Sequence, residues 1–196
     1  KLYVRRVFIT DDCEGLIPPY LRFVKGIIDT DDIDLNVSRE MLQNNPVVAK
    51  IKSAIIKRVI SELKKKANKE SDEYAKFWDA FGAVLKEGIH EDFTNRDKIL
   101  EVCRFNSSES DKLISLDDYV SRMKDGQDKI YYVSGEDKNK LSQSPHLEGF
   151  KAKGIEVIYM TDPVDEFWLP SVGKFSEKDF QSITKGGADL DKIKSD

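Results

Sequence analysis

Cysteine, histidine and long apolar runs are scarce in this sequence of 196 residues. The two cysteines, Cys13 and Cys103, lie far apart and outside any Cys-x-x-Cys motif, so neither a disulfide framework nor a zinc site is indicated. A reducing compartment is favoured. No apolar run approaches the roughly 20 residues that cross a bilayer, so we expect no membrane partner. The opening segment alternates like a strand and lacks an initiator methionine, which is typical of an excised fragment.

The motifs of stand-alone enzymes are missing as well. The sequence has no Gly-x-x-x-x-Gly-Lys-Ser/Thr phosphate loop, no Gly-x-Gly-x-x-Gly, no His-Glu-x-x-His and no Gly-x-Ser-x-Gly. His90 and His146 lie in polar contexts. We interpret His90-Glu91-Asp92 as a capping loop between helices, with a metal or acid/base site as the alternative. We therefore expect no metal, no cofactor and no enzymatic activity in this chain alone.

The composition is that of a charge-rich globular protein. Apolar residues make up 39%, charged residues 35% and aromatic residues 10% of the chain, which favours a folded body over disorder. The 36 acidic and 32 basic residues give a net charge of −4, and the basic residues are scattered. Nucleic acid is therefore not expected as a partner.

The first third of the sequence alternates between short strands and short helices. We expect one strand over 2–9 and a second over 26–29, with a short helix between them. Ser38 is placed to cap a short helix that begins at Arg39 and ends before Pro46.

The rest of the sequence predicts a helical centre followed by a second strand and helix alternation. The expected helices cover a long stretch from Val47, then 74–85, 99–103, 115–123, 137–143, 145–153 and a segment from Val164, and the expected strands cover 129–135 and 156–160. The pattern predicts an α/β (α+β) fold with two βαβ-type three-layer sandwich units joined by a short helical bundle.

We divide the chain accordingly into four parts. Residues 1–67 form the larger α/β subdomain, 68–104 a helical connector, 105–186 a smaller α/β subdomain, and 187–196 a polar tail that frays or leads to a following domain.

One candidate for chemistry stands out in the segment 35–43, Leu-Asn-Val-Ser-Arg-Glu-Met-Leu-Gln. It places the Arg39 guanidinium in the first turn of a short helix, with Gln43 on the same helix face. Arginine suits a γ-phosphate because it stays charged and offers a planar fork of donors. From the residues alone, a surface or ion-pair role for Arg39 is the commoner one, so both interpretations stay open.

Five segments, 2–9, 35–43, 88–92, 129–132 and 161–166, resemble motifs of the heat-shock protein 90 family in the same order. The resemblance covers almost the whole chain, and the Ser-Arg-Glu-Met-Leu-Gln block is close to a family signature. Members of this family are homodimeric, ATP-driven chaperones with N-terminal, middle and C-terminal domains. The chain is similar to most of the middle domain.

The resemblance implies a role for Arg39 in a split active site. It matches the middle-domain arginine that reaches the γ-phosphate of ATP, which the separate N-terminal domain binds with Mg²⁺. Gln43 is then its neighbour on the catalytic loop, within residues 1–67. Arg5 and Lys57 match further basic positions near that nucleotide interface. The full-length protein is expected to be an ATPase.

The resemblance also implies a client-binding surface. Phe8 matches an apolar interface position, and Glu166, Phe167 and Trp168 match a client-binding segment. Bacterial relatives have Trp directly after the Asp-Glu pair, whereas Phe167 stands there in this chain, so the sequence leaves open which ring faces outward. Packing of the Phe-Trp pair into the core is the alternative.

The implied partners are the N-terminal ATPase domain of the same protein, client proteins, co-chaperones, and a second copy joined through a C-terminal dimerisation domain towards which 187–196 lead. The implied location is the bacterial cytoplasm or an organellar matrix. Two other functions are weighed against this one: a pure client or co-chaperone binding module, and a stand-alone enzyme.

Overall fold

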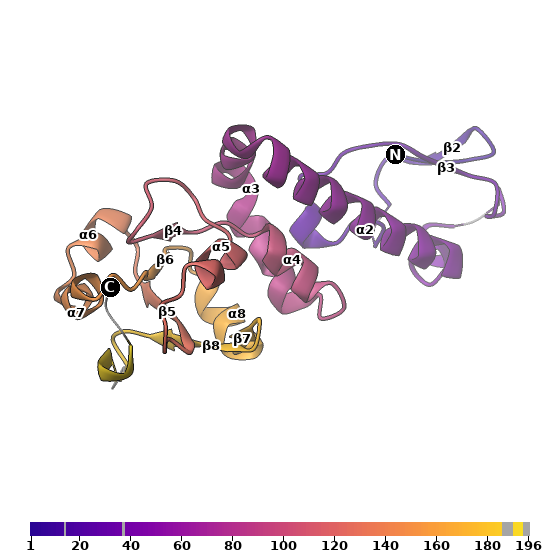
Figure 1. Cartoon of the computed structure of the whole chain (residues 1–196). Helices are drawn as coiled ribbons and strands as arrows, with labels where there is room; N and C mark the ends of the chain where they lie inside the picture. The colour runs from indigo at the N-terminus through magenta and orange to yellow at the C-terminus, as the bar shows by residue number, and fades with distance from the viewer. Residues whose placement is uncertain (14, 37, 186–189, 194–196) are drawn as a thin grey trace. The chain divides into compact units, whose positions relative to one another are not determined.

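The computed structural model describes residues 1–13, 15–36, 38–185 and 190–193, together with the backbone but not the side chain of Arg39. Two compact units make up the chain, Lys1–Lys69 and Glu70–Asp196 (Figure 1). The helices predicted for the connector 68–104 belong to the second unit. The subdomain roles assigned to the predicted parts stay predictions. In the part of the chain that the structure describes, every helix is too short or too polar to span a bilayer.

The first unit combines a small sheet with two α-helices. Its elements are β1 (Leu2–Val4), β2 (Val7–Thr10), the 3-10 helix η1 (Pro19–Leu21), β3 (Ile28–Thr30), α1 (Arg39–Gln43) and α2 (Pro46–Lys69). The strand order is β2-β1-β3, with β1 antiparallel to β2 and parallel to β3. Leu2 and Val4 on β1 are fully buried and pack in one cluster with Leu42 of α1 and Val48 of α2.

A hairpin replaces the single strand predicted over 2–9. Val4 pairs with Val7, and Arg5 and Arg6 form the turn between them with φ angles of 47° and 66°. Positive φ at both central residues is the geometry of the tightest hairpin turns, which usually carry Asn or Gly. Two arginines give no such signal, so the prediction of one strand was wrong.

The second unit is built around a five-stranded sheet. Its helices are α3 (Ser71–Glu91), α4 (Arg96–Val102), α5 (Leu116–Ser121), α6 (Lys138–Ser142), η2 (Pro145–Leu147), α7 (Glu148–Ala152), α8 (Asp165–Val172) and η3 (Leu190–Lys192). Its strands are β4 (Asn106–Ser107), β5 (Lys129–Ser134), β6 (Ile158–Met160), β7 (Lys174–Phe175) and β8 (Lys178–Ser182), in the order β4-β6-β5-β8-β7. The central strand β5 is parallel to both neighbours.

Helices cover both faces of this sheet. Successive residues of a strand point to opposite faces, so the side chains of Tyr131 and Tyr132 of β5 lie on opposite faces of the sheet. The Tyr131 ring contacts Phe150 of α7 with 4.9 Å between centroids, whereas Tyr132 contacts Phe180, which in turn contacts Trp168 of α8 at 5.6 Å. The parallel pair β5 and β6, joined through α6, η2 and α7, is the predicted βαβ connection. The predicted pair of sandwich units stays a prediction for the chain as a whole.

The second unit differs from the sequence-based prediction in three places. Residues 90–92 were predicted to form a capping loop, but α3 continues to Glu91. Only Asp92 lies outside the helix, and its carboxylate accepts from the backbone N–H and the side-chain amide of Asn95. The hairpin of β7 and β8 was missed. The predicted tail 187–196 includes η3 and Ile193, which is 4% exposed and belongs to the core. Residues 186–189 and 194–196 lie outside the described residues.

Candidate functional site

The segment around Arg39 folds as its sequence predicts. The Ser38 hydroxyl accepts a hydrogen bond from the Met41 backbone N–H at 3.4 Å, so Ser38 is the N-cap and Arg39 is the first residue of α1. Leu42 is 2% exposed and anchors the helix to the core. Gln43 is the last residue of α1 and is exposed. The Arg39 side chain lies outside the described residues.

The other basic candidates lie on separate elements of the first unit. Arg5 is exposed in the β1–β2 turn, and its backbone N–H donates to the Thr30 carbonyl at 3.1 Å. Lys57 is on the exposed side of α2. Phe8 of β2 is 52% exposed and meets the Tyr3 ring edge-on at 5.6 Å between centroids. The roles assigned to these residues stay predictions.

At the beginning of α8, the two neighbouring aromatic residues differ in their exposure to solvent. Trp168 is fully buried between Phe105 and Phe180, whereas Phe167 is 65% exposed and Glu166 is exposed. A buried indole cannot contact a client, so the prediction that included Trp168 in the client-binding surface is wrong for this structure. Glu166 and Phe167 are accessible.

A buried ionic cluster lies beneath this helix. Lys86 of α3 contacts Asp165 Oδ1 at 2.6 Å and Asp162 Oδ2 at 2.7 Å, and the side chains of Lys86 and Asp165 are 3% and 1% exposed. Burial by itself lowers the pKa of Lys86, but the carboxylates of Asp165 and Asp162 outweigh it, so the pKa lies above its ordinary value. Lys86 therefore stays charged.

Sequence reasoning missed Lys86 and Asp165. The available signal was a lysine inside the apolar face of α3, four residues after the buried Gly82 and between the buried Leu85 and Ile89. Charged residues are rarely fully buried unless they are paired. That signal gives no partner, because Asp165 lies 79 residues further along the chain.

A cavity of about 150 Å³ opens beside the cluster. Lys86 and Asp162 line it together with Arg104, Asn106 and Trp78, so it is mostly polar. Within the described ranges no group of three or more His, Cys, Asp or Glu side chains is placed to hold a metal ion. Cys103 lies near Lys86, and burial raises the pKa of its thiol to about 12, so it stays protonated and unreactive at neutral pH.

Comparison with known proteins defines the class. The chain belongs to the Hsp90 protein family, whose model matches residues 1–196. The chain is 60% identical over 195 residues to chaperone protein HtpG of Paramagnetospirillum magneticum and 59% identical over 193 residues to chaperone protein HtpG of Roseobacter denitrificans. These matches cover 100% and 98% of the chain, and in each case the chain spans about 31% of the relative's length.

Proposed function

We propose that the chain is the middle segment of an ATP-dependent molecular chaperone. The observation that carries the proposal is the 60% identity over the whole chain to a chaperone protein HtpG. ATP and Mg²⁺ are bound mainly by an N-terminal domain outside this chain, and the protein is a homodimer through a C-terminal domain, in the cytoplasm or an organellar matrix. Clients and co-chaperones bind the assembled protein.

In this proposal, Arg39 supplies a positive charge to the γ-phosphate when the domains close. A fixed cation near the transferring phosphoryl group stabilises the charge of the transition state without reorganisation. The Ser38 cap supports the assignment, because it starts α1 at a defined residue and so fixes the backbone from which Arg39 extends. Gln43 supports the loop, and Arg5 and Lys57 contribute positive charge near the interface.

The test is ATP turnover by the full-length protein with Arg39→Ala. We expect turnover to fall about 100-fold or more with nucleotide affinity nearly unchanged, since arginines of this kind contribute about 10³–10⁵ in rate. Arg58→Ala is the matched control, because Arg58 is an exposed arginine paired with Glu62 on α2. Turnover in Arg39→Ala equal to that of the control would refute the catalytic role.

Client binding without a catalytic contribution is the second candidate, favoured by the exposed aromatic rings of Phe8 and Phe167. Under this candidate, Phe167→Ala weakens binding of an unfolded model protein while basal ATP turnover is unchanged. Arg39→Ala then has no effect on either measurement. Phe81→Ala, at a 39% exposed ring on α3, is the control for nonspecific loss of aromatic surface.

A further inference from the structure

Asp165, the first residue of α8, is the hub of the buried cluster. Its Oδ1 accepts from Lys86 Nζ at 2.6 Å and from the Trp168 indole N–H at 2.8 Å. Its Oδ2 accepts from the Asp162 backbone N–H at 3.1 Å. One carboxylate thus joins α3, the turn before α8 and the indole on the next turn of α8.

Hydrophobic burial alone distinguishes poorly between the two aromatic residues of α8. Phe167 and Trp168 are neighbours and therefore lie about 100° apart around the helix axis, so a rotation of that size would exchange them. Each ring removes a comparable apolar area from water when it is buried. The difference between them is chemical: an indole has an N–H that needs an acceptor in the interior, and a phenyl ring has none.

The helix itself is too weak to fix its own orientation. α8 is only 8 residues long and contains Pro170, which removes one backbone donor. A helix of this length owes most of its stability to tertiary contacts. Rotating α8 would separate the Asp165 carboxylate from the buried Lys86 ammonium, which would keep only its contact to the partly exposed Asp162.

We propose that Lys86 and Asp165 are positioning residues: their buried ion pair fixes the rotation of α8 so that Trp168 points inward and Phe167 is presented to client proteins. The value of Phe167 as a contact rests on the proposed function; the orientation does not. The ion pair is thus a device for conformational specificity, since a buried pair commonly contributes little net stability compared with apolar residues of similar volume.

The orientation is tested in the 196-residue chain with Trp78→Phe, because Trp168 is then the only tryptophan. The test variant combines Lys86→Met with Asp165→Asn, so that no unpaired buried charge remains. The control is Lys76→Met, which removes a lysine from the same helix whose 2.6 Å contact to Glu73 lies between side chains 73% and 55% exposed. We expect the test variant to unfold cooperatively, with Trp168 emission at longer wavelength and stronger acrylamide quenching, and the control to match the parent.

Two results would overturn the proposal. Parental emission and quenching in the folded test variant would show that the indole finds its place without the ion pair. Loss of the cooperative transition would show that the pair is required for folding and is not specific to the orientation of α8. The single variant Lys86→Met, which leaves Asp165 with the indole and the Asp162 backbone N–H as donors, should show a shift in the same direction.

The consequence for clients is measured in the full-length protein with reduced, carboxymethylated α-lactalbumin as a permanently unfolded probe. We expect the double variant and Phe167→Ala to bind it about tenfold more weakly, as for a central contact residue, and Lys76→Met to bind normally. If Trp168 changes its environment while neither variant loses affinity, the client function of Phe167 fails and the positioning role stands.

Discussion

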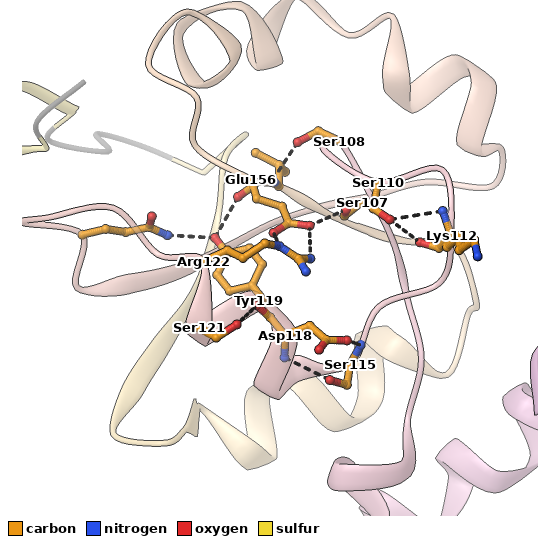
Figure 2. Close-up of polar contacts among 12 residues, drawn as sticks. Ser107, Ser108, Ser110, Lys112, Ser115, Asp118, Tyr119, Ser121, Arg122 and Glu156 are labelled. Carbon is orange, nitrogen blue, oxygen red and sulfur yellow. Dashed lines mark hydrogen bonds and ion pairs between the residues drawn. The ribbon is translucent and has the colours of Figure 1, made fainter. Parts of the chain in front are cut away.

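Arg122 and Glu156 form a two-point ion pair, with Nε to Oε2 at 3.0 Å and Nη2 to Oε1 at 2.9 Å (Figure 2). Glu156 precedes β6 and its side chain is 6% exposed, whereas Arg122 follows α5 and is 44% exposed. Ser107 of β4 donates to the same carboxylate at 2.5 Å. The pair therefore joins the end of α5 to the edge of the sheet.

Arg122→Met should lower the free energy of unfolding by about 2 kcal/mol. The variant leaves the buried Glu156 carboxylate without its cation, and the exposure of Arg122 keeps the loss below that of a fully buried pair. Urea denaturation followed by circular dichroism measures it. Arg58→Met, at an exposed pair with Glu62, should change the free energy of unfolding far less, because water and salt screen an exposed pair. Equal losses in the two variants would contradict the prediction.

Tyr119→Phe should cost about 2 kcal/mol. The Tyr119 hydroxyl donates to the Glu156 carbonyl at 2.8 Å and accepts from the Gln127 amide and the Tyr131 backbone N–H, both at 2.9 Å. Removing it leaves three buried groups without this partner. Tyr132→Phe is the control, because Tyr132 is half-buried on the other face of β5 and its hydroxyl makes no hydrogen bond to the described residues. A smaller loss for Tyr119→Phe than for the control would sink the idea.

Gly82→Ala should destabilise α3 even though alanine is the better helix former by about 1 kcal/mol. A Cβ at Gly82 would stand 2.6 Å from Cε2 and 2.7 Å from Cδ2 of the Trp78 ring, which is rigid and nearly buried. The indole must move. Gly149→Ala in α7, where the nearest atom is a Leu190 methyl at 3.3 Å, should be tolerated. Thermal unfolding of both variants compares them, and a gain in stability for Gly82→Ala would be the contrary result.

Stability should fall as the pH rises above about 9, partly through Cys103. Burial is the main cause that raises the pKa of this thiol from 9.0 to about 12. Because the unfolded chain ionises first, the folded state loses up to about 1.4 kcal/mol per pH unit between these values. Tyr74 and Tyr119, whose pKa values burial raises above 10.0, add to the fall at higher pH.

Urea midpoints of the parent and of Cys103→Ala at about pH 8 and about pH 10 isolate the thiol. The alanine variant loses some stability at both pH values through the small cavity, but its decline between them should be shallower. Parallel declines in the two proteins would show that the thiol does not contribute.

Residues that suit positive φ angles should stabilise the turn between β7 and β8. Ser176 and Glu177 have φ angles of 50° and 61°, which cost free energy for residues with a Cβ. Ser176→Asn combined with Glu177→Gly should raise the free energy of unfolding by about 1 kcal/mol. Glu177→Val should lower it, because a branched side chain is strained at positive φ. Urea denaturation compares the two variants, and a higher unfolding midpoint for Glu177→Val than for Ser176→Asn with Glu177→Gly would contradict this turn geometry.

Local features of this protein could be read from the sequence because their causes are local. Ser38 and Ser115 cap helices as predicted, since an N-cap requires a hydroxyl and a backbone N–H only three residues away. The apolar spacing placed α2 and α3, and the β-branched and aromatic run placed β5. The hairpins at 5–6 and 176–177 escaped prediction because their turns lack Gly and Asn.

The tertiary structure alone decided which residues of the second unit meet. Within α8, Asp165 accepts from the Trp168 indole three residues further on, but the lysine that pairs with Asp165 lies 79 residues earlier in the chain. The sequence determined the family, the long helices α2 and α3, the strand β5 and the helix start that carries Arg39. The burial of Lys86 with Asp165 depends on long-range packing, where one charge is stable in the interior only because another is brought to it.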